Sequence, residues 1–368
     1  MAIIQGICER ELDLEPDAME LPGLLLRGTS QGSPVTEGAL GLVAEDGGDV
    51  VGVCIGSLGR IAADGPRRGH VDLLAVGGNA RGRGIGMRLL SGMETLLRER
   101  GAAVALLSGN PPLYAWPGVD ARYTAMTCLA ERAGYEKYRD AVDMAVSLRA
   151  ADLDTRPAEE RLAAAGIAVR RAAATEAGPI VDWLRHGPWG ASGWPDEVAS
   201  SLAREAVAEQ AVAEQAVAEQ AVAGRASTAT SSAGCHVACR DDRYIGFASH
   251  GAVRRGWFGP MGIDAAERQH GIGTVLLKRC VADMAAAGLD TARIGWVGPV
   301  RFYAQVLGAR VERIYWLYRK VLLSTCPSMA ACSPGSTARS RRTGSAAGWI
   351  VAWQACCCSR ATSPVRTS

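Results

Sequence analysis

Two glycine-rich segments of the sequence have the residue types and the spacing needed to hold a phosphate group. Residues 81–87 read Arg-Gly-Arg-Gly-Ile-Gly-Met, and residues 268–274 read Arg-Gln-His-Gly-Ile-Gly-Thr. The first N–H groups of a helix have no partner within the helix and lie at the positive end of its dipole, so they attract anions. Glycine leaves such N–H groups uncovered, and the leading arginine adds a positive charge. Each segment therefore predicts a pyrophosphate site.

The sequence around each segment predicts the same three elements, namely a strand, a turn and a helix. The expected elements are strands at 71–76 and 258–263 and helices at 87–100 and 274–287. The two copies keep a constant offset of 187 residues beyond the glycines, which pairs Val76 with Ile263 and Gly101 with Gly288. A chance recurrence of a turn would not carry its flanking elements with it. The chain is therefore predicted to contain two copies of one domain, each of about 150 residues.

The two segments differ from other common phosphate-binding loops. A Walker loop ends in Gly-Lys-Ser/Thr, and the dinucleotide fingerprint Gly-x-Gly-x-x-Gly places its first glycine earlier. The pattern instead resembles the acetyl-CoA pyrophosphate loop of the GNAT N-acetyltransferases, Arg/Gln-x-x-Gly-x-Gly/Ala, and the chain resembles a tandem GNAT protein over residues 36–150 and 167–321. The resemblance implies an α/β fold, with a mixed sheet flanked by helices in two tandem GNAT acyltransferase domains. It also implies acetyl-CoA as the acetyl donor.

The resemblance further implies where the cofactor binds. In GNAT enzymes the strand before the loop carries a bulge and separates from the next strand. The gap admits the pantetheine arm of CoA, and main-chain N–H groups polarise the thioester carbonyl. The implied cofactor-binding residues are Met261, Ile263, Arg268, Gln269, His270, Gly271, Ile272, Gly273 and Thr274 in the C-terminal copy, and Val76, Arg81, Gly82, Arg83, Gly84, Ile85, Gly86 and Met87 in the N-terminal copy.

A second family feature separates the two copies. Many GNAT enzymes have a later helix reading aromatic-Tyr-x-x-x-Gly, whose tyrosine protonates the departing CoA thiolate. Phe302 and Tyr303 match the aromatic pair, with the glycine one residue later, at Gly308. Aligning Gly308 with Gly134 places Leu129 where Tyr303 stands, so the N-terminal copy lacks the hydroxyl. We therefore expect Tyr303 to be catalytic and the N-terminal copy to be abbreviated and non-catalytic. The alternative for Tyr303 is a half-buried core tyrosine.

The N-terminal copy contains 13 extra residues at 111–123, which read Pro-Pro-Leu-Tyr-Ala-Trp-Pro-Gly-Val-Asp-Ala-Arg-Tyr. Aromatic rings and a carboxylate in a loop stiffened by proline suit a polar ring ligand. Trp116 or Tyr114 would stack on the ligand, and Asp120 would meet a cationic amine. The alternative is a packing plug between the domains.

Changes in composition divide the chain further. We expect an N-terminal GNAT domain at 1–150, a linker at 151–166, a C-terminal GNAT domain at 167–323 and a disordered tail at 324–368. The C-terminal domain includes a low-complexity helical insertion at 203–234, built on Ala-Val-Ala-Glu-Gln repeats. The tail contains no Asp or Glu, so it is either a true tail or an out-of-frame extension. A metal-binding or lipidated tail is the functional alternative.

The composition narrows the function class. A net charge of +2 argues against bulk attraction to nucleic acid, and no apolar run is long enough to cross a membrane or to start a secreted chain. We expect a cytoplasmic enzyme, monomeric or homodimeric, that acts on a small-molecule amine. Cys235, His236, Cys239 and His250 lie in an expected pair of strands, where alternation sends side chains to different faces, so no metal site is predicted.

The acceptor and the general base are the least determined features. Residues 257–260 (Trp-Phe-Gly-Pro) and 294–299 (Ile-Gly-Trp-Val-Gly-Pro) look most like bacterial enzymes that acetylate amino sugars, including glucosamine-type and aminoglycoside-type acceptors. An aminoglycoside acceptor would make this an antibiotic-resistance activity. The alternatives are a mycothiol-synthase-like acetyltransferase of a thiol-metabolite precursor, or a catalytically silent acetyl-CoA-binding regulator. The carboxylates available as a base are Asp264, Glu267, Asp196, Glu197 and Asp120.

Overall fold

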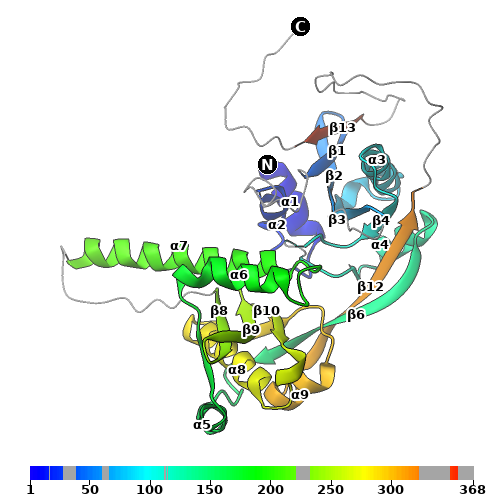
Figure 1. Cartoon of the computed structure of the whole chain (residues 1–368). Helices are drawn as coiled ribbons and strands as arrows, with labels where there is room; N and C mark the ends of the chain where they lie inside the picture. The colour runs from blue at the N-terminus through cyan, green and yellow to red at the C-terminus, as the bar shows by residue number, and fades with distance from the viewer. Residues whose placement is uncertain are drawn as a thin grey trace, which may run out of the picture. The chain divides into compact units, whose positions relative to one another are not determined.

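Strands and helices form mixed sheets flanked by helices, which confirms the predicted α/β class (Figure 1). The structure is a computed structural model and describes residues 1–15, 17–27, 39–59, 66–111, 113, 115–220, 233–322 and 349–354. The chain divides into two units. Unit 1 comprises Met1–Asn110, Ala125–Lys137 and Tyr318–Ser368, and unit 2 comprises Pro111–Thr124 and Tyr138–Leu317.

Unit 1 contains the N-terminal loop and the elements that hold it. In chain order these elements are α1 (Ala2–Glu11), α2 (Leu21–Arg27), β1 (Leu40–Asp46), β2 (Asp49–Leu58), β3 (Arg68–Val76), the 3-10 helix η1 (Gly78–Ala80), α3 (Ile85–Glu99), β4 (Val104–Leu107), α4 (Thr124–Arg132) and β13 (Trp349–Gln354). The sheet runs in the order β13-β1-β2-β3-β4 and continues into the end of β12 (Arg310–Val321).

Helix α3 covers the unit 1 sheet with one apolar face. Leu89, Leu90, Met93 and Leu97 recur at helical spacing and are fully buried against β1, β2 and β3. Helix α1 packs on β2 and β3, and Figure 1 shows α1 and α2 on the other side of these strands from α3. The sheet therefore has a helical layer on each face, and the loop between β3 and α3 lies at its edge.

Unit 2 contains the C-terminal loop. Its elements are β5 (Val119–Asp120), β6 (Glu136–Ser147), α5 (Arg156–Ala164), β7 (Ile167–Arg171), η2 (Ala174–Glu176), α6 (Ala177–His186), α7 (Trp194–Gln220), β8 (Gly234–Arg240), β9 (Arg243–His250), β10 (Trp257–Ile263), η3 (Ala265–Glu267), α8 (Ile272–Ala286), β11 (Thr291–Ile294), α9 (Val300–Leu307) and β12. The sheet order is β12-β6-β11-β10-β9-β8-β7, and β5 pairs with β12.

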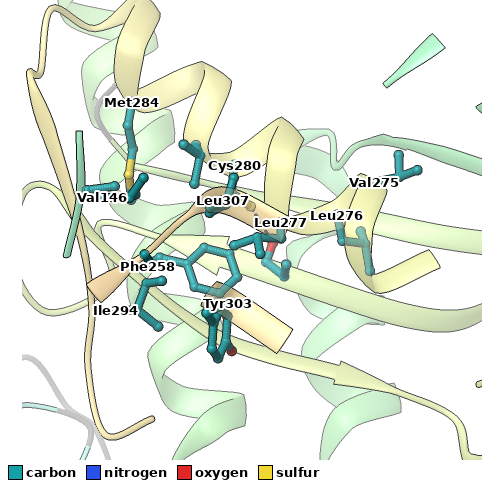
Figure 2. Close-up of a cluster of buried hydrophobic side chains, with 14 of the residues drawn as sticks. Val146, Phe258, Val275, Leu276, Leu277, Cys280, Met284, Ile294, Tyr303 and Leu307 are labelled. Atoms are coloured by element: carbon teal, nitrogen blue, oxygen red, sulfur yellow. Dashed lines mark hydrogen bonds between the residues drawn. The ribbon is translucent and has the colours of Figure 1, made fainter. Parts of the chain in front are cut away.

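The core of unit 2 has two parts because neighbouring residues of a strand face opposite sides of the sheet. Ala238 and Ala248 belong to the cluster around α8, whereas Val237 and Phe247 belong to the cluster under α6 and α7. Figure 2 shows the α8 cluster, in which Cys280 and other α8 side chains meet side chains of β6, β10, β11 and α9. The loop before α8 is thus anchored by a helix that is buried along most of its length.

Each unit contains a strand that comes from the sequence copy of the other unit. In unit 1 the strand beside β4 is the end of β12, with Tyr318 opposite Leu107. In unit 2 the strand beside β11 is β6, with Met144 opposite Ile294. The units are therefore interleaved in sequence. The expected boundaries at 150, 166 and 323 describe the two sequence copies and stay a prediction.

The predicted low-complexity helix and tail fall partly outside the described residues. The repeats form the second half of α7, which ends at Gln220, and residues 221–232 lie outside the description. Of the tail expected to be disordered, the structure describes 349–354, which form β13 antiparallel to β1. The prediction did not include this strand. No helix among the described residues is long and apolar enough to cross a membrane.

Candidate active site

The two glycine-rich loops adopt the same backbone conformation. Gly84 and Gly271 immediately precede α3 and α8 in the left-handed region, with φ of 77° and 85°. Gly82 and Gln269, two residues earlier, both have φ of 74°. A Cβ built on Gly84 or Gly271 would meet nothing within 4 Å. The space in front of each helix start is therefore open, as an anion site requires.

The last glycine of each loop serves the packing of the helix. A Cβ on Gly273 would lie 3.1 Å from Ile263 Cδ1 and 3.5 Å from the Phe302 ring. A Cβ on Gly86 would lie 3.2 Å from Leu129 Cδ2. These glycines let the first turn of the helix approach its neighbours closely. Ile272 and Thr274 in α8, and Ile85 and Met87 in α3, occupy the same first turns.

The charges around the two loops differ. In unit 1, Glu11 of α1 forms an ion pair with Arg81 and accepts a hydrogen bond from the Gly78 N–H at 2.8 Å. Arg83 pairs with Asp46, with 2.6 Å between Nη1 and Oδ2. Both arginines of the N-terminal loop are thus neutralised by carboxylates of their own unit.

The C-terminal loop keeps its positive charge. Arg268 is exposed and forms no ion pair with any residue that the structure describes. The nearest acidic residue in sequence, Glu267, is bound by Arg240 through two contacts of 3.1 and 2.8 Å, and this hydrogen bonding lowers the pKa of Glu267. His270 Nδ1 lies 3.2 Å from the Glu267 carbonyl oxygen. Arg268 is therefore available to an external anion.

The strand before each loop carries the expected bulge and separates from its neighbour. In unit 2, β10 and β11 pair only at Trp257–Arg293 and Phe258–Ile294, and the register of β10 against β9 shifts between Phe258 and Met261. In unit 1, β3 and β4 pair only from Arg68 to His70, and the register of β2 against β3 shifts beyond Ile55. The bulge and the strand separation expected before each loop are confirmed in both copies; that the separation admits the pantetheine arm stays a prediction.

Tyr303 lies beside the gap in unit 2. Its ring packs edge-on against Phe258, the last β10 residue paired with β11, with 6.1 Å between ring centroids. Figure 2 shows the ring below Phe258, with its hydroxyl pointing away from the labelled hydrophobic side chains. Burial raises the pKa of Tyr303 to about 12. The hydroxyl therefore keeps its proton at neutral pH.

The corresponding gap in unit 1 is lined by polar side chains. Ser57, His70, Asp72, Ser108 and Asn110 are all buried, and Asn110 Nδ2 donates to Ser57 Oγ at 3.1 Å. His70 Nδ1 lies 3.2 Å from Ser108 Oγ. Burial raises the pKa of Asp72 to about 7 and lowers that of His70 to about 4. Next to the point where β3 and β4 separate, unit 1 therefore carries hydrogen-bonded polar side chains, where unit 2 has apolar side chains and a tyrosine.

The face of unit 2 opposite α8 carries aromatic rings next to β10. Trp189, in the turn between α6 and α7, lies on Gly262, where an added Cβ would be 2.6 Å from Trp189 Cε2. Trp183 and Phe247 meet the Trp189 ring edge-on at 5.3 and 5.2 Å. The sequence reasoning did not name Trp189. The sequence around it, Gly-Pro-Trp-Gly at 187–190, is typical of a tight turn and could have indicated this position.

The candidate bases occupy different environments. Asp196 and Glu197 are buried in the first turn of α7, and Arg185 Nη2 lies 3.3 Å from Asp196 Oδ1. Asp264 follows β10 directly, and burial raises the pKa of this carboxyl. Glu267 forms an ion pair with Arg240. Asp196 and Glu197 lie on the side of the sheet that carries Trp189, because the α6–α7 segment that contains all three residues packs on that side.

The 111–123 insertion belongs to unit 2. Trp116 packs against Ala141, Tyr315 and Leu317, and Asp120 lies in β5 opposite Tyr315. Arg122 donates to both Asp120 oxygens, with contacts from 2.5 to 3.2 Å. A substrate amine would have to compete with this guanidinium, so the role of Asp120 stays a prediction. Tyr114 lies outside the described residues.

The comparisons with known proteins agree with this geometry. The acetyltransferase (GNAT) family model matches residues 20–115 and 200–309, more than half of the chain. Among solved structures, the chain is similar to a GCN5-related glucosamine N-acetyltransferase region of a fungal multi-domain GH3 β-N-acetylglucosaminidase, with TM-score 0.61, 18% identity and 86% of this chain covered. It spans 36% of that fungal protein.

A second solved structure matches most of both chains. A tandem GNAT protein from the clavulanic acid biosynthesis pathway has TM-score 0.54 and 19% identity, with 89% of this chain and 96% of that protein covered. The comparison with curated protein sequences gave no match. The likeness to the two structures establishes the fold. Since the family match covers more than half of the sequence, in two regions, the chain belongs to the GNAT acetyltransferase family and is an acyltransferase that takes its acetyl group from acetyl-CoA.

Proposed function

We propose that the C-terminal copy transfers the acetyl group of acetyl-CoA to a primary amine of an amino sugar or an aminoglycoside. The observation that carries this proposal is the pairing, in unit 2, of an open loop that keeps Arg268 unneutralised with Tyr303 beside the adjoining gap. The N-terminal copy is proposed to be non-catalytic, because Glu11 and Asp46 neutralise its loop and Leu129 replaces the tyrosine.

The C-terminal loop fits the pyrophosphate of the donor. The left-handed Gly271 exposes the start of α8, nothing lies within 4 Å of its missing side chain, and Arg268 supplies a cation. Residues 268–274 would hold the phosphates, and main-chain N–H groups near Met261 and Ile263 would polarise the thioester carbonyl. When bound, acetyl-CoA supplies the activated acetyl group.

Proton transfers complete the reaction. A C–N bond forms while the C–S bond breaks, the amine nitrogen loses one proton and the departing sulfur gains one. Tyr303 is proposed as the acid for the sulfur, because its pKa of about 12 keeps the hydroxyl protonated. An amine attacks only when neutral, so a carboxylate or a water leading to one must remove its proton. Asp196 and Glu197 are the proposed carboxylates, because they lie on the face that carries Trp189.

The chemistry of that face favours an amino sugar. The apolar face of a sugar ring packs well on an indole, and an ammonium group is attracted to nearby carboxylates. Trp189 offers the indole next to β10, and Asp196 and Glu197 offer the carboxylates. The fungal region similar in structure is described as a glucosamine N-acetyltransferase, which agrees with this acceptor class. Acetylation of an aminoglycoside would remove one of its positive charges, so a resistance role is part of the proposal, together with a cytoplasmic location.

An acceptor panel tests the proposal. Purified protein would receive acetyl-CoA with glucosamine, an aminoglycoside such as kasugamycin, or a peptide amine, and release of free CoA would be followed over time. We expect turnover with an amino sugar or the aminoglycoside. Trp189→Ala should raise the acceptor KM about tenfold, whereas Trp189→Phe should keep most of the stacking surface. A marked preference for the peptide amine would contradict the acceptor class.

A further inference from the structure

The gap between β10 and β11 opens at one well-defined place. The two strands are paired up to Phe258 and Ile294, after which β10 continues to Ile263 while the other chain leaves the ladder. The departing residues are Gly295, Trp296 and Val297. Whatever holds these three residues away from β10 determines whether the gap exists.

Two hydrogen bonds tie the departing residues to β6. The Trp296 N–H donates to Asp143 Oδ1 at 2.8 Å, and the Val297 N–H donates to the Val142 carbonyl oxygen at 2.9 Å. β6 lies on the side of β11 away from β10. Both bonds therefore draw the chain away from the ladder with β10. Asp143 is fully buried, and a hydrogen bond to a carboxylate is stronger than one between neutral groups.

The backbone at this point is constrained. Trp296 has φ of 46°, in the left-handed region that non-glycine residues rarely adopt. Such a conformation persists only when the surroundings impose it. The neighbouring Gly295 is enclosed: an added Cβ would lie 3.0 Å from Trp257 Cζ3 on one side and 3.8 Å from Asp143 Oδ1 on the other.

We propose that Asp143 is a positioning residue that keeps the cofactor gap of unit 2 open by holding Trp296 on β6. This inference rests on the proposal that the C-terminal copy binds the donor. Asp143 belongs to the last strand of the N-terminal sequence copy, so that copy contributes to the catalytic unit although its own loop is neutralised. The ligand affected is the pantetheine arm of CoA, which must enter between the separated strands.

The test compares two substitutions in the full chain. Asp143→Ala removes the acceptor of the Trp296 N–H and should weaken CoA binding, measured by calorimetry without an acceptor, about tenfold. Asp143→Asn keeps a side-chain oxygen and should bind CoA within about threefold of the unaltered protein. In Asp143→Ala the KM for acetyl-CoA should rise while the KM for the amine stays unchanged. Asp140→Ala, an exposed acid on the same strand, is the matched control and should change neither value.

Other outcomes overturn the inference. A merely structural role would make the alanine and asparagine variants lose stability without separating the two KM values. If Asp143→Ala does not fold, hydrogen exchange of the unaltered protein decides: the Trp296 amide should exchange at least about 100-fold more slowly than an unbonded loop amide, and fast exchange would refute the tether. Unchanged CoA affinity in Asp143→Ala, with binding abolished by Gly271→Glu, would reject this inference alone. Binding that survives Gly271→Glu would instead reject the proposed catalytic copy.

Discussion

The N-terminal and C-terminal loops share a backbone but differ in what surrounds them. Gly84 and Gly271 have nearly the same left-handed φ, and both precede a buried helix. Yet Arg81 is paired with Glu11, whereas Arg268 forms no ion pair within the described part of the chain. A shared motif therefore establishes shared geometry. Whether the site is available depends on charges supplied from elsewhere in the unit.

The side chains beside the strand separation also differ between the two units. Phe258, Ile294 and Tyr303 form an apolar wall in unit 2. In unit 1 the corresponding position carries buried polar side chains, among them Asp72 and His70. The strand separation is thus bordered by apolar side chains and a tyrosine hydroxyl in unit 2, and by hydrogen-bonded polar side chains in unit 1. This contrast predicts that equivalent changes in the two copies will have unequal effects.

The largest difference should follow from a glutamate at the loop glycine. Gly271→Glu places a carboxylate against the expected pyrophosphate and should leave turnover at most about 1% of normal, since like charges at such distances repel by several kcal/mol. Gly84→Glu should leave most of the turnover. The two glycines share φ and open surroundings, so the backbone strain is matched. Steady-state assays of both variants measure this difference, with Gly271→Gln as the uncharged control. If only the N-terminal substitution abolished turnover, the catalytic copy would be the N-terminal one.

The next largest effect should come from the tyrosine. Tyr303→Phe keeps the ring against Phe258 and removes the hydroxyl, so a rate loss reports proton delivery; such steps are worth roughly 10²- to 10⁴-fold. The rate of the unaltered enzyme should rise with pH as the acceptor amine loses its proton, and it should not fall before about pH 10, because the Tyr303 pKa is about 12. A pH–rate profile measures both. Full activity of the phenylalanine variant would remove Tyr303 from the mechanism.

Neutralising the carboxylates of the N-terminal loop should have a smaller effect. Glu11→Gln combined with Asp46→Asn removes both anions that face Arg81 and Arg83, and should strengthen CoA binding to unit 1 by about tenfold. Calorimetry should then detect a second, weak CoA site, while turnover stays unchanged. Two CoA sites in the unaltered protein would show that the ion pairs do not close the loop.

The smallest effect on turnover is expected from the polar gap in unit 1. The pKa of Asp72 is raised from 3.8 to about 7, so between these values the unfolded chain releases a proton that the folded chain retains. Stability therefore falls as pH rises through this window, by at most about 1.4 kcal/mol per pH unit. Asp72→Asn should be more stable than the unaltered protein by a margin that grows from about pH 4 to pH 7 and then levels off.

Chemical unfolding at several pH values measures that margin. The pKa of His70 is lowered to about 4, so its contribution has the opposite sign, but it is present in both proteins and largely cancels in the difference. A margin that does not change with pH would mean that Asp72 is ionised throughout. The Asp72 carboxylate would then be exposed to water rather than buried among the polar side chains.

Local patterns in the sequence predicted most of the elements around the site. The strand ending at Ile263 and the helix that follows the loop are confirmed as β10 and α8, within two residues at their ends. These features depend on neighbours in sequence, namely apolar periodicity and glycine turns. The sequence did not predict that β6 pairs with β11 and that the end of β12 pairs with β4. Either strand could extend any open sheet edge, and consecutive elements of a chain are usually neighbours, so each strand was expected beside its own sequence copy.

The sequence by itself determined the duplicated loop and the Tyr303–Leu129 difference between the copies, because these are properties of residue type and short-range spacing. Only the tertiary structure decided that Glu11 neutralises one loop and that Asp143 tethers the chain beside the other gap. Glu11 lies 70 residues before Arg81, and Asp143 lies 153 residues before Trp296. Contacts over such separations depend on how the sheets assemble, and no local pattern records them.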